Sequence, residues 1–372
     1  MILKPPVDLS TGGFVLCIWW SASARIYGKE MGMNANAIEF GAKQAVENCL
    51  NVKRGENVVI ITDRETERLA DALKKKAAEI GAEVQKFIME DFGTRPDDGE
   101  HAIQFPSAIG NALKNAQVSF YIAQGKKGEL QSFRIPMLKV VEEHKLRHGH
   151  MPNFIEDMMS QGMAADYTKI QEISKKVYNL ASKAKQIRVT TSGGTDVTAT
   201  FDQKYKWVIC DGNIKAGHWS NLPDGEVFSS PVDTKGKVVV DGCLGDFFNK
   251  KYGDLSKTPL SYELQNSRCV KGSVRCLNAE LKKEFEEYTF NTDENSDRVG
   301  EFAIGTNIGL TKLICNLLQD EKFPGVHIAL GSPYPDKTGA EWESTAHNDG
   351  VMRNVTIEID GKKIMENSRF LI

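Results

Sequence analysis

Hydrophobic and polar residues alternate along the first half of the chain in a helix-and-strand order. Apolar positions between 34 and 50 repeat every three or four residues, which predicts a helix. The run NVVIIT at 57–62 predicts a buried strand, and the mixed segment 64–82 predicts a second helix. Further strands are predicted at 84–90 and 118–124. A strand, helix and strand in this order, with a continuously apolar first strand, are typical of a parallel sheet.

The pattern changes in the second half of the chain. After a lysine-rich helical segment at 170–185, short stretches with two-residue alternation appear between turns rich in Gly, Asn and Asp; they are IRVTTS, DVTATF, KGKVVVDG and VTIEIDGKKI. This change predicts a domain boundary near residue 185. We therefore expect an α/β N-terminal domain with a mainly parallel sheet over 33–185, and a β-rich α+β C-terminal domain over 186–372.

The first 32 residues differ from both predicted domains. FVLCIWW at 14–20 lies between Lys4 and the small residues SASA, as in a secretory signal peptide. Pro5, Pro6 and Asp8 interrupt the region before it, and the run is far shorter than the ~20 apolar residues that span a membrane. We interpret 1–32 as a leader or extended start outside the fold.

The composition and the absence of certain motifs exclude several classes of function. The net charge of −3 gives no basic surface for nucleic acid. Neither a phosphate-binding loop nor a dinucleotide fingerprint follows the predicted strands. The seven cysteines are scattered and never in C-x-x-C spacing, which is typical of a reduced, cytoplasmic protein. We expect no nucleic-acid or membrane partner.

Acidic residues and histidines recur close together in the last third of the chain. Carboxylate and imidazole groups are ligands that zinc, manganese, cobalt and iron accept, and no thiolate is mixed in. Each of these residues has an ordinary alternative role when taken singly, as a surface acid or a core histidine. As an ordered set they predict a catalytic metal centre: Glu226, Glu301, Asp320-Glu321, His327, His347 and Asp349.

These residues lie in motifs that resemble a known family. NLPDGEVFSSP, TDENSDRVGE, DEK, HIALGSPY and AHNDG resemble, in order, the landmarks of the thermophilic-type metalloaminopeptidases, also called the aminopeptidase T, S and II family. The similarity extends from about Met33 to the C-terminus and leaves residues 1–32 without a counterpart. The resemblance implies two divalent metal ions (zinc, cobalt or manganese) in the C-terminal domain. It also implies a peptide substrate with a free N-terminus and a homodimer.

The family's ligand set transfers to this chain residue by residue. The resemblance assigns three glutamates, two histidines and an aspartate as metal ligands: Glu226, Glu301, Glu321, His327, His347 and Asp349. The third glutamate rests on matching Asp320-Glu321-Lys322 to a D-E-N motif, so that Lys322 stands where the family has asparagine. If the stretch around His347 is extended, the side chains of His347 and Asp349 point the same way, toward one cation.

The resemblance also assigns catalytic roles. Two cations ~3.5–4 Å apart can activate water and polarise a peptide carbonyl together. The position matching Glu301 moves protons, and the position matching Tyr334 donates a hydrogen bond to the oxyanion. We expect Trp219 and Asn307 to shape the pocket.

Two other functions compete with the aminopeptidase hypothesis. The related 2,5-dihydroxypyridine dioxygenases also resemble these motifs, and their ring cleavage needs one iron(II), which a His-Asp-Glu set can hold. A non-catalytic relative is the alternative if Lys322 places its charge in the ligand position. A second metal site, formed by His144, His148 and His150, lacks an acidic partner, and neighbouring basic residues disfavour a cation there.

Overall fold

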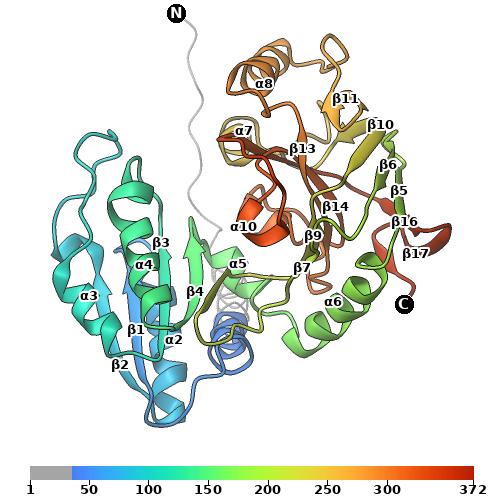
Figure 1. The fold of residues 1–372 in the computed structure, drawn as a ribbon. Helices are drawn as coiled ribbons and strands as arrows, with labels where there is room; N and C mark the ends of the chain where they lie inside the picture. Colours follow the sequence, from blue (N-terminus) through green and yellow to red (C-terminus); the bar gives the residue numbers. More distant parts are fainter. Residues whose placement is uncertain (1–35) are drawn as a thin grey trace, which may run out of the picture.

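The computed structural model describes residues 36–372, which form two lobes that lie side by side (Figure 1). The interpreted leader 1–32, with its apolar run at 14–20, lies outside the described residues. Residues 36–43 are helical and continue into η1 (Gln44–Cys49), in agreement with the predicted first helix. No helix in the described part is long and apolar enough to cross a membrane.

The N-terminal lobe is built on a five-stranded parallel sheet, here sheet A. Its order is β2 (Glu83–Ile88), β1 (Asn57–Thr62), β3 (Val118–Ala123), β4 (Arg147–Pro152) and β8 (His218–Asn221). The first three strands form where the apolar runs predict them. β8 lies beyond residue 185 yet pairs with β4, so the N-terminal sheet takes its edge strand from the second half of the chain.

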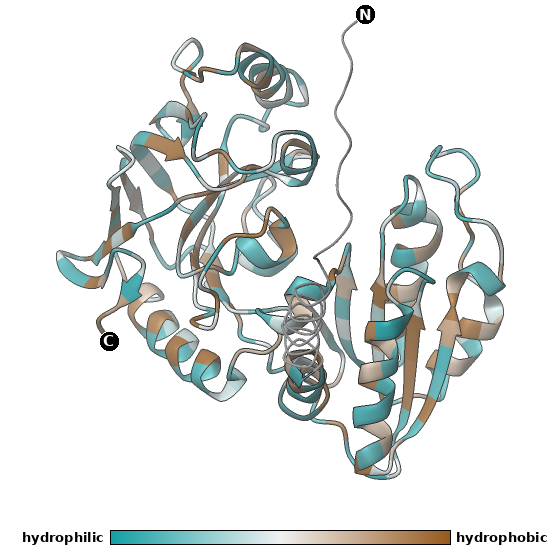
Figure 2. Cartoon of the chain, turned by 180° about the vertical axis from the view of Figure 1, so that it is seen from behind, coloured by the Kyte–Doolittle hydropathy of each residue, from teal (hydrophilic) through white to brown (hydrophobic). Residues whose placement is uncertain are grey.

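Helices cover both faces of sheet A, as a parallel sheet requires. One face packs on η1 and α2 (Glu67–Ile80), and the other on α3 (Ser107–Lys114) and α4 (Ile135–Glu143). α2 ends at Gly81, whose φ of 90° is the left-handed conformation that favours glycine. Figure 2 shows hydrophobic residues concentrated on the strands between these helices.

The C-terminal lobe contains two antiparallel sheets. Sheet B is eight-stranded, and its order is β12 (Arg268–Cys269), β11 (Leu260–Gln265), β10 (Asp233–Val240), β6 (Asp196–Thr200), β5 (Gln186–Thr191), β16 (Val355–Ile359), β17 (Lys362–Glu366) and β18 (Arg369–Phe370). Sheet C is five-stranded, in the order β15 (His347–Val351), β14 (Gly325–Gly331), β13 (Val299–Gly305), β9 (Glu226–Ser229) and β7 (Val208–Cys210). The predicted fold class is confirmed.

Sheets B and C share one hydrophobic core. Alternate residues of β13 and β14, such as Phe302 and Ile328, point into it together with Val189 and Val238 of sheet B. The remaining elements lie outside the sheets of the two lobes: η2 (Met89–Asp91), η3 (Leu130–Arg134), α5 (Glu156–Ser160), α6 (Tyr167–Ala181), α7 (Asp246–Tyr252), α8 (Ala279–Asn291), α9 (Leu317–Asp320) and α10 (Pro335–Thr338). Because one face of sheet C is used by the core, its other face is left for polar groups.

Candidate metal centre

Strand register places five of the six predicted ligands on the polar face of sheet C, and the sixth, Glu321, directly follows α9. Directly opposed residues of antiparallel strands share a face. Ala329 of β14 is paired with Glu301 on one side and with Asp349 on the other. Glu226 is paired with Gly305, which lies on the same face of β13 as Glu301. The alanine between the two acids is small, so their carboxylates face a shared space.

The chain that surrounds these strands also fixes their side chains. A β-bulge lies between Val299 and Glu301, and a Cβ on Gly300 would come within 2.2 Å of the Gly331 carbonyl oxygen. Gly225, just before Glu226, has a φ of 131°, and a Cβ there would lie 2.8 Å from the backbone nitrogen of Asn307. Both positions therefore require glycine, and each directs the adjacent glutamate into the centre.

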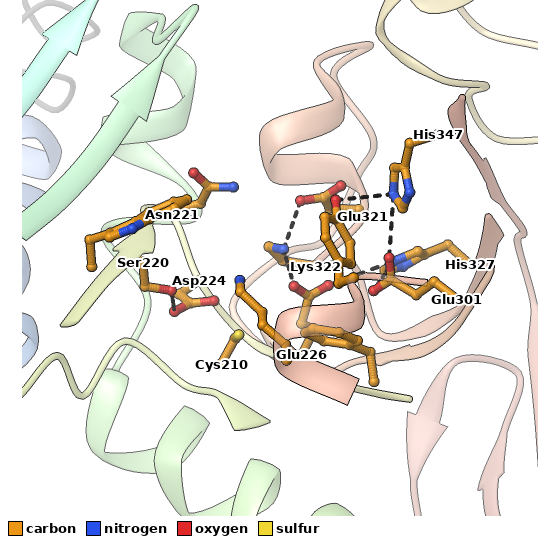
Figure 3. A pocket seen from close by; sticks show the side chains of 14 residues that line it. Cys210, Ser220, Asn221, Asp224, Glu226, Glu301, Glu321, Lys322, His327 and His347 are labelled. Atoms are coloured by element: carbon orange, nitrogen blue, oxygen red, sulfur yellow. Dashed lines mark hydrogen bonds and ion pairs between the residues drawn. The ribbon is translucent and has the colours of Figure 1, made fainter. Parts of the chain in front are cut away.

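All six predicted ligands meet in one cluster, and Figure 3 shows the five of them other than Asp349. His327 Nε2 lies 3.6 Å from Glu226 Oε2 and 3.8 Å from Glu301 Oε1. His347 Nε2 lies 3.4 Å from both Glu301 Oε2 and Asp349 Oδ1. The stretch that holds His347 and Asp349 is strand β15, so its predicted extended conformation is confirmed.

The cluster divides into overlapping groups whose ligand atoms lie within 4.8 Å of one another. Glu226, Glu301 and His327 form one group, and Glu301, His347 and Asp349 form another. A third group joins Glu321, His327 and Asp349, so Glu321 reaches the centre although Lys322 follows it. Glu301 belongs to two groups and is placed to bridge them.

Unpaired buried atoms make this cluster suitable for a cation. Within residues 36–372, Glu226 Oε2 and Asp349 Oδ1 are buried without a hydrogen-bond donor. A buried, unpaired carboxylate oxygen is costly, and a divalent cation would satisfy it. Oxygen and imidazole nitrogen are ligands that zinc, manganese and cobalt accept. The residues present therefore fit the metal that the sequence motifs imply.

The electrostatics of the cluster also favour a bound cation. Burial lowers the pKa of His327, but Glu301 and the other carboxylates outweigh burial and raise it to about 9. The pKa of His347 is likewise raised, by Asp349 and Glu301 against burial. Burial alone would raise the pKa of Glu301, but the two imidazoles hold it below the usual range. Protonated histidines here supply positive charge that a bound cation would replace, because a histidine ligand must be neutral.

Lys322 is a further member of the centre, and the sequence indicated it only as a departure from the family pattern. Its side chain is 2% exposed, and its Nζ lies 2.6 Å from Glu226 Oε1 and 2.7 Å from Glu321 Oε1. These carboxylates outweigh burial and raise the pKa of Lys322 well above its usual value. Lys322 therefore brings a fixed positive charge against two of the predicted ligands.

Tyr334 lies at the edge of the same centre. Its phenol oxygen is 3.2 Å from His347 Nε2, and its ring packs edge-on against Phe228 at 5.8 Å. Its φ of 51° is left-handed, an uncommon conformation for a tyrosine, and places it at the start of α10. Burial and the neighbouring carboxylates raise the pKa of Tyr334 well above its usual value, so its hydroxyl is kept as a donor.

The cluster forms one wall of a pocket whose other wall comes from around β8. Trp219 lines the pocket, as predicted, together with Ser220 and Asn221. Asn307 does not line it; its side-chain amide donates to the Asp224 carbonyl oxygen at 2.9 Å and holds the turn before Glu226. Figure 3 shows the residues of this wall facing the carboxylates across the pocket.

The pocket also contains residues that the sequence motifs did not single out. Asp224 is buried, and burial raises its pKa to about 6. Cys210 lies close enough to Asp224 and Glu226 for the three side chains to bind one metal ion together. Lys337 lies over the rings of Trp219 and Tyr334 at 5.4 and 5.5 Å. Asp224 could have been found from its place in the PDGE motif, whereas the other two have no local pattern.

The alternative histidine site does not assemble. His148 and His150 are buried on β4, where His148 Nδ1 lies 2.8 Å from Ser119 Oγ and His150 stacks on Tyr121. His144 is exposed. No acidic ligand joins them among the candidate groups of the described chain.

Comparison with known proteins agrees with the geometry. The family of thermophilic metalloproteases (M29) matches residues 160–363, and the chain belongs to this family. The resemblance found in the sequence motifs is therefore confirmed, and membership supports a metal-dependent peptidase. Comparison with curated proteins gave no significant match.

Two solved structures share the fold. AmpT from Thermus thermophilus superposes with a TM-score of 0.64 at 18% identity, over 91% of this chain and 100% of that one. The 2,5-dihydroxypyridine dioxygenase from Pseudomonas putida KT2440 also superposes with a TM-score of 0.64. The sequence identity is 15%, and the match covers 91% of this chain and 97% of the dioxygenase. At these identities the likeness concerns the fold, and the choice between chemistries rests on the site.

Proposed function

We propose that this chain is a metal-dependent aminopeptidase, which removes the N-terminal residue from peptides. The observation that carries the proposal is the convergence of the ligand groups on one buried face of sheet C. Membership in a metalloprotease family supports it.

The residues that would hold the metal are those of the cluster. Glu301, His347 and Asp349 would hold one divalent cation. His327 would hold a second, together with Glu226 and Glu301 or with Glu321 and Asp349. Zinc, cobalt or manganese suits this set of oxygen and nitrogen ligands. When bound, two such cations would activate water and polarise the scissile carbonyl.

The protein side chains supply proton transfer and charge stabilisation. Glu301 lies between the two imidazoles and is ionised, as a group that takes a proton from water must be. Tyr334 keeps its proton and can donate a hydrogen bond to the oxyanion of the tetrahedral intermediate. The phenol stabilises this charge without carrying a charge of its own.

The same pocket suits a free N-terminus. Asp224 and Glu226 lie together on the wall beside the cluster, where a substrate α-ammonium would be attracted. An acylated N-terminus has no such charge and would not be attracted by these carboxylates. This difference favours removal of single N-terminal residues over internal cleavage.

The proposal is tested by peptide hydrolysis. Chelator-stripped protein is supplied with zinc, cobalt or manganese and assayed on leucine p-nitroanilide, on short peptides and on the same peptides N-acetylated. We expect metal-dependent release from the free peptides and none from the acetylated ones. No release from any free peptide with any of the three metals would refute the proposal, and equal cleavage of both forms would refute the aminopeptidase part.

A second candidate is an iron(II) ring-cleaving dioxygenase of the 2,5-dihydroxypyridine type. The specific observation in its favour is that His327 Nε2 and His347 Nε2 lie 3.9 and 3.4 Å from Asp349 Oδ1, and two imidazoles with one carboxylate are the ligands of mononuclear iron oxygenases. The additional glutamates of the cluster favour the peptidase. Anaerobic reconstitution with iron(II), followed by oxygen uptake on a dihydroxypyridine, distinguishes the two. Oxygen uptake without peptide hydrolysis would decide for the dioxygenase.

We further propose a homodimer, because of the family resemblance, and a cytoplasmic location, because of the scattered cysteines. The cysteines of the described part are free thiols. Size-exclusion chromatography with light scattering tests the dimer, and a monomeric mass would contradict it.

A further inference from the structure

The side chain of Lys322 occupies a position inside the centre where a cation would otherwise bind. Its ammonium bridges Glu226 and Glu321, at 2.6 and 2.7 Å, and is almost completely buried (Figure 3). Two carboxylates that the proposed function assigns to a metal are thus already paired with an internal positive charge. A divalent cation that uses these oxygens has to displace the ammonium.

The rest of the centre is arranged differently. Glu301 Oε2 and Asp349 Oδ1 lie 3.4 Å from His347 Nε2, which is itself a predicted ligand, and the ammonium of Lys322 pairs instead with the two other acids. The candidate group formed by Glu301, His347 and Asp349 is therefore open to a cation. Each of the two other candidate groups around His327 contains Glu226 or Glu321, a partner of Lys322.

The charge of the centre favours binding of the first divalent cation over binding of the second. When ionised, the four carboxylates of the centre carry four negative charges, of which Lys322 neutralises one. A first divalent cation leaves the centre with one negative charge, and a second leaves it with one positive charge. Without the lysine charge, a second cation would bring the centre to neutrality. A buried excess positive charge disfavours the second cation.

On the basis of the proposed function, we propose that this chain holds one divalent cation tightly, at Glu301, His347 and Asp349. The second cation binds weakly, because it competes with Lys322 for Glu226 and Glu321. Lys322 is thus a positioning residue that sets the metal stoichiometry. Residues around the ligands of a metal commonly change its affinity by about 10–100-fold, which is the difference expected between the two places.

The test measures metal binding rather than activity. The full-length chain is stripped with a chelator and titrated with Mn²⁺ at constant pH, with calorimetry for affinity, elemental analysis for bound metal and electron paramagnetic resonance for spin coupling. We expect one tightly bound Mn²⁺ with an uncoupled spectrum. Lys322→Gln should bind a second Mn²⁺ about 10–100-fold more tightly than the unmodified chain does and give a spin-coupled spectrum.

Two further variants separate charge from structure. Lys322→Arg keeps the charge and should keep one tight Mn²⁺. Lys337→Gln removes a positive charge from the same pocket, but Lys337 lies over aromatic rings rather than against a carboxylate, so the stoichiometry should stay at one. Circular dichroism of each variant verifies folding, and the stoichiometry of the unmodified chain tests the proposal even if Lys322→Gln does not fold.

The outcomes distinguish this inference from the proposed function. Two equally tight Mn²⁺ ions in the unmodified chain, or one in a folded Lys322→Gln, would overturn the inference and leave the aminopeptidase proposal standing. One tight Mn²⁺ in the unmodified chain and two in Lys322→Gln, without hydrolysis of any peptide, would support the inference and refute the peptidase. Absence of Mn²⁺ binding would overturn the inference, and hydrolysis assayed with zinc and cobalt would then decide the peptidase proposal.

Discussion

Acid should destabilise this protein through a buried histidine pair beside the pocket. His148 Nδ1 lies 2.8 Å from Ser119 Oγ, and its Nε2 lies 3.3 Å from His150 Nδ1. His150 in turn packs against Trp219 at 5.6 Å, at the strand that lines the pocket. Both imidazoles are buried without a carboxylate partner within residues 36–372, so the fold admits them only in their neutral form.

The size of the effect follows from the shift of the pKa. Burial lowers the pKa of His148 from 6.5 to about 3. Between these values the unfolded chain holds one more proton than the folded chain, so the free energy of unfolding falls as the pH falls. The loss is about 1.36 kcal/mol per pH unit, or about 2 kcal/mol between about pH 8 and about pH 5. Stability is complete above pH 6.5 and is lost progressively toward about 3.

The assay is urea unfolding of metal-stripped protein, so that metal release does not contribute. In His148→Gln the residue no longer titrates, and the loss of unfolding free energy between about pH 8 and about pH 5 should shrink by about 2 kcal/mol. His144→Gln replaces an exposed histidine nearby and should leave the loss unchanged. An identical pH dependence in His148→Gln and the unmodified chain would refute the reasoning.

Four further predictions concern the centre and the N-terminal lobe. Glu301→Gln should lower kcat by about 10²–10⁴-fold in a folded, metal-loaded enzyme, and near-normal kcat would exclude Glu301 as the base. Tyr334→Phe should lower kcat by up to about 10²–10³-fold with little change in KM, and an unchanged kcat in steady-state kinetics would remove its oxyanion role. His347→Ala and Asp349→Ala should each weaken metal binding in equilibrium dialysis, and full metal content in both at acidic pH would show that neither is a ligand. Arg95→Met should lower the free energy of unfolding by about 3–5 kcal/mol, because it leaves buried carboxylates unpaired; urea unfolding checks this, and a loss below about 1 kcal/mol would contradict it.

Local features of the sequence were sufficient for part of the secondary structure, including β1, β2 and β3 of sheet A and β5, β6, β10, β16 and β17 of sheet B. The apolar run at 57–62 becomes β1 with the same bounds, since a strand buried on both faces needs uninterrupted apolar residues. The Asp360-Gly361 pair accepts positive φ values of 47° and 80° and therefore turns β16 back on β17. Two of the ligand motifs were also visible, because Glu226 and Glu301 each follow a glycine that the backbone requires.

Only the tertiary structure decided how distant segments combine. β8 joins the N-terminal sheet from beyond the predicted boundary, and no local pattern in HWSN specifies a partner strand. Lys322 reaches Glu226 across 96 positions of the sequence, so the sequence marked it as a departure without showing its ion pairs. The sequence by itself determined which ligands and turns this protein has. Strand order and register, which depend on packing across the whole lobe, decided that the ligands meet and that a lysine lies among them.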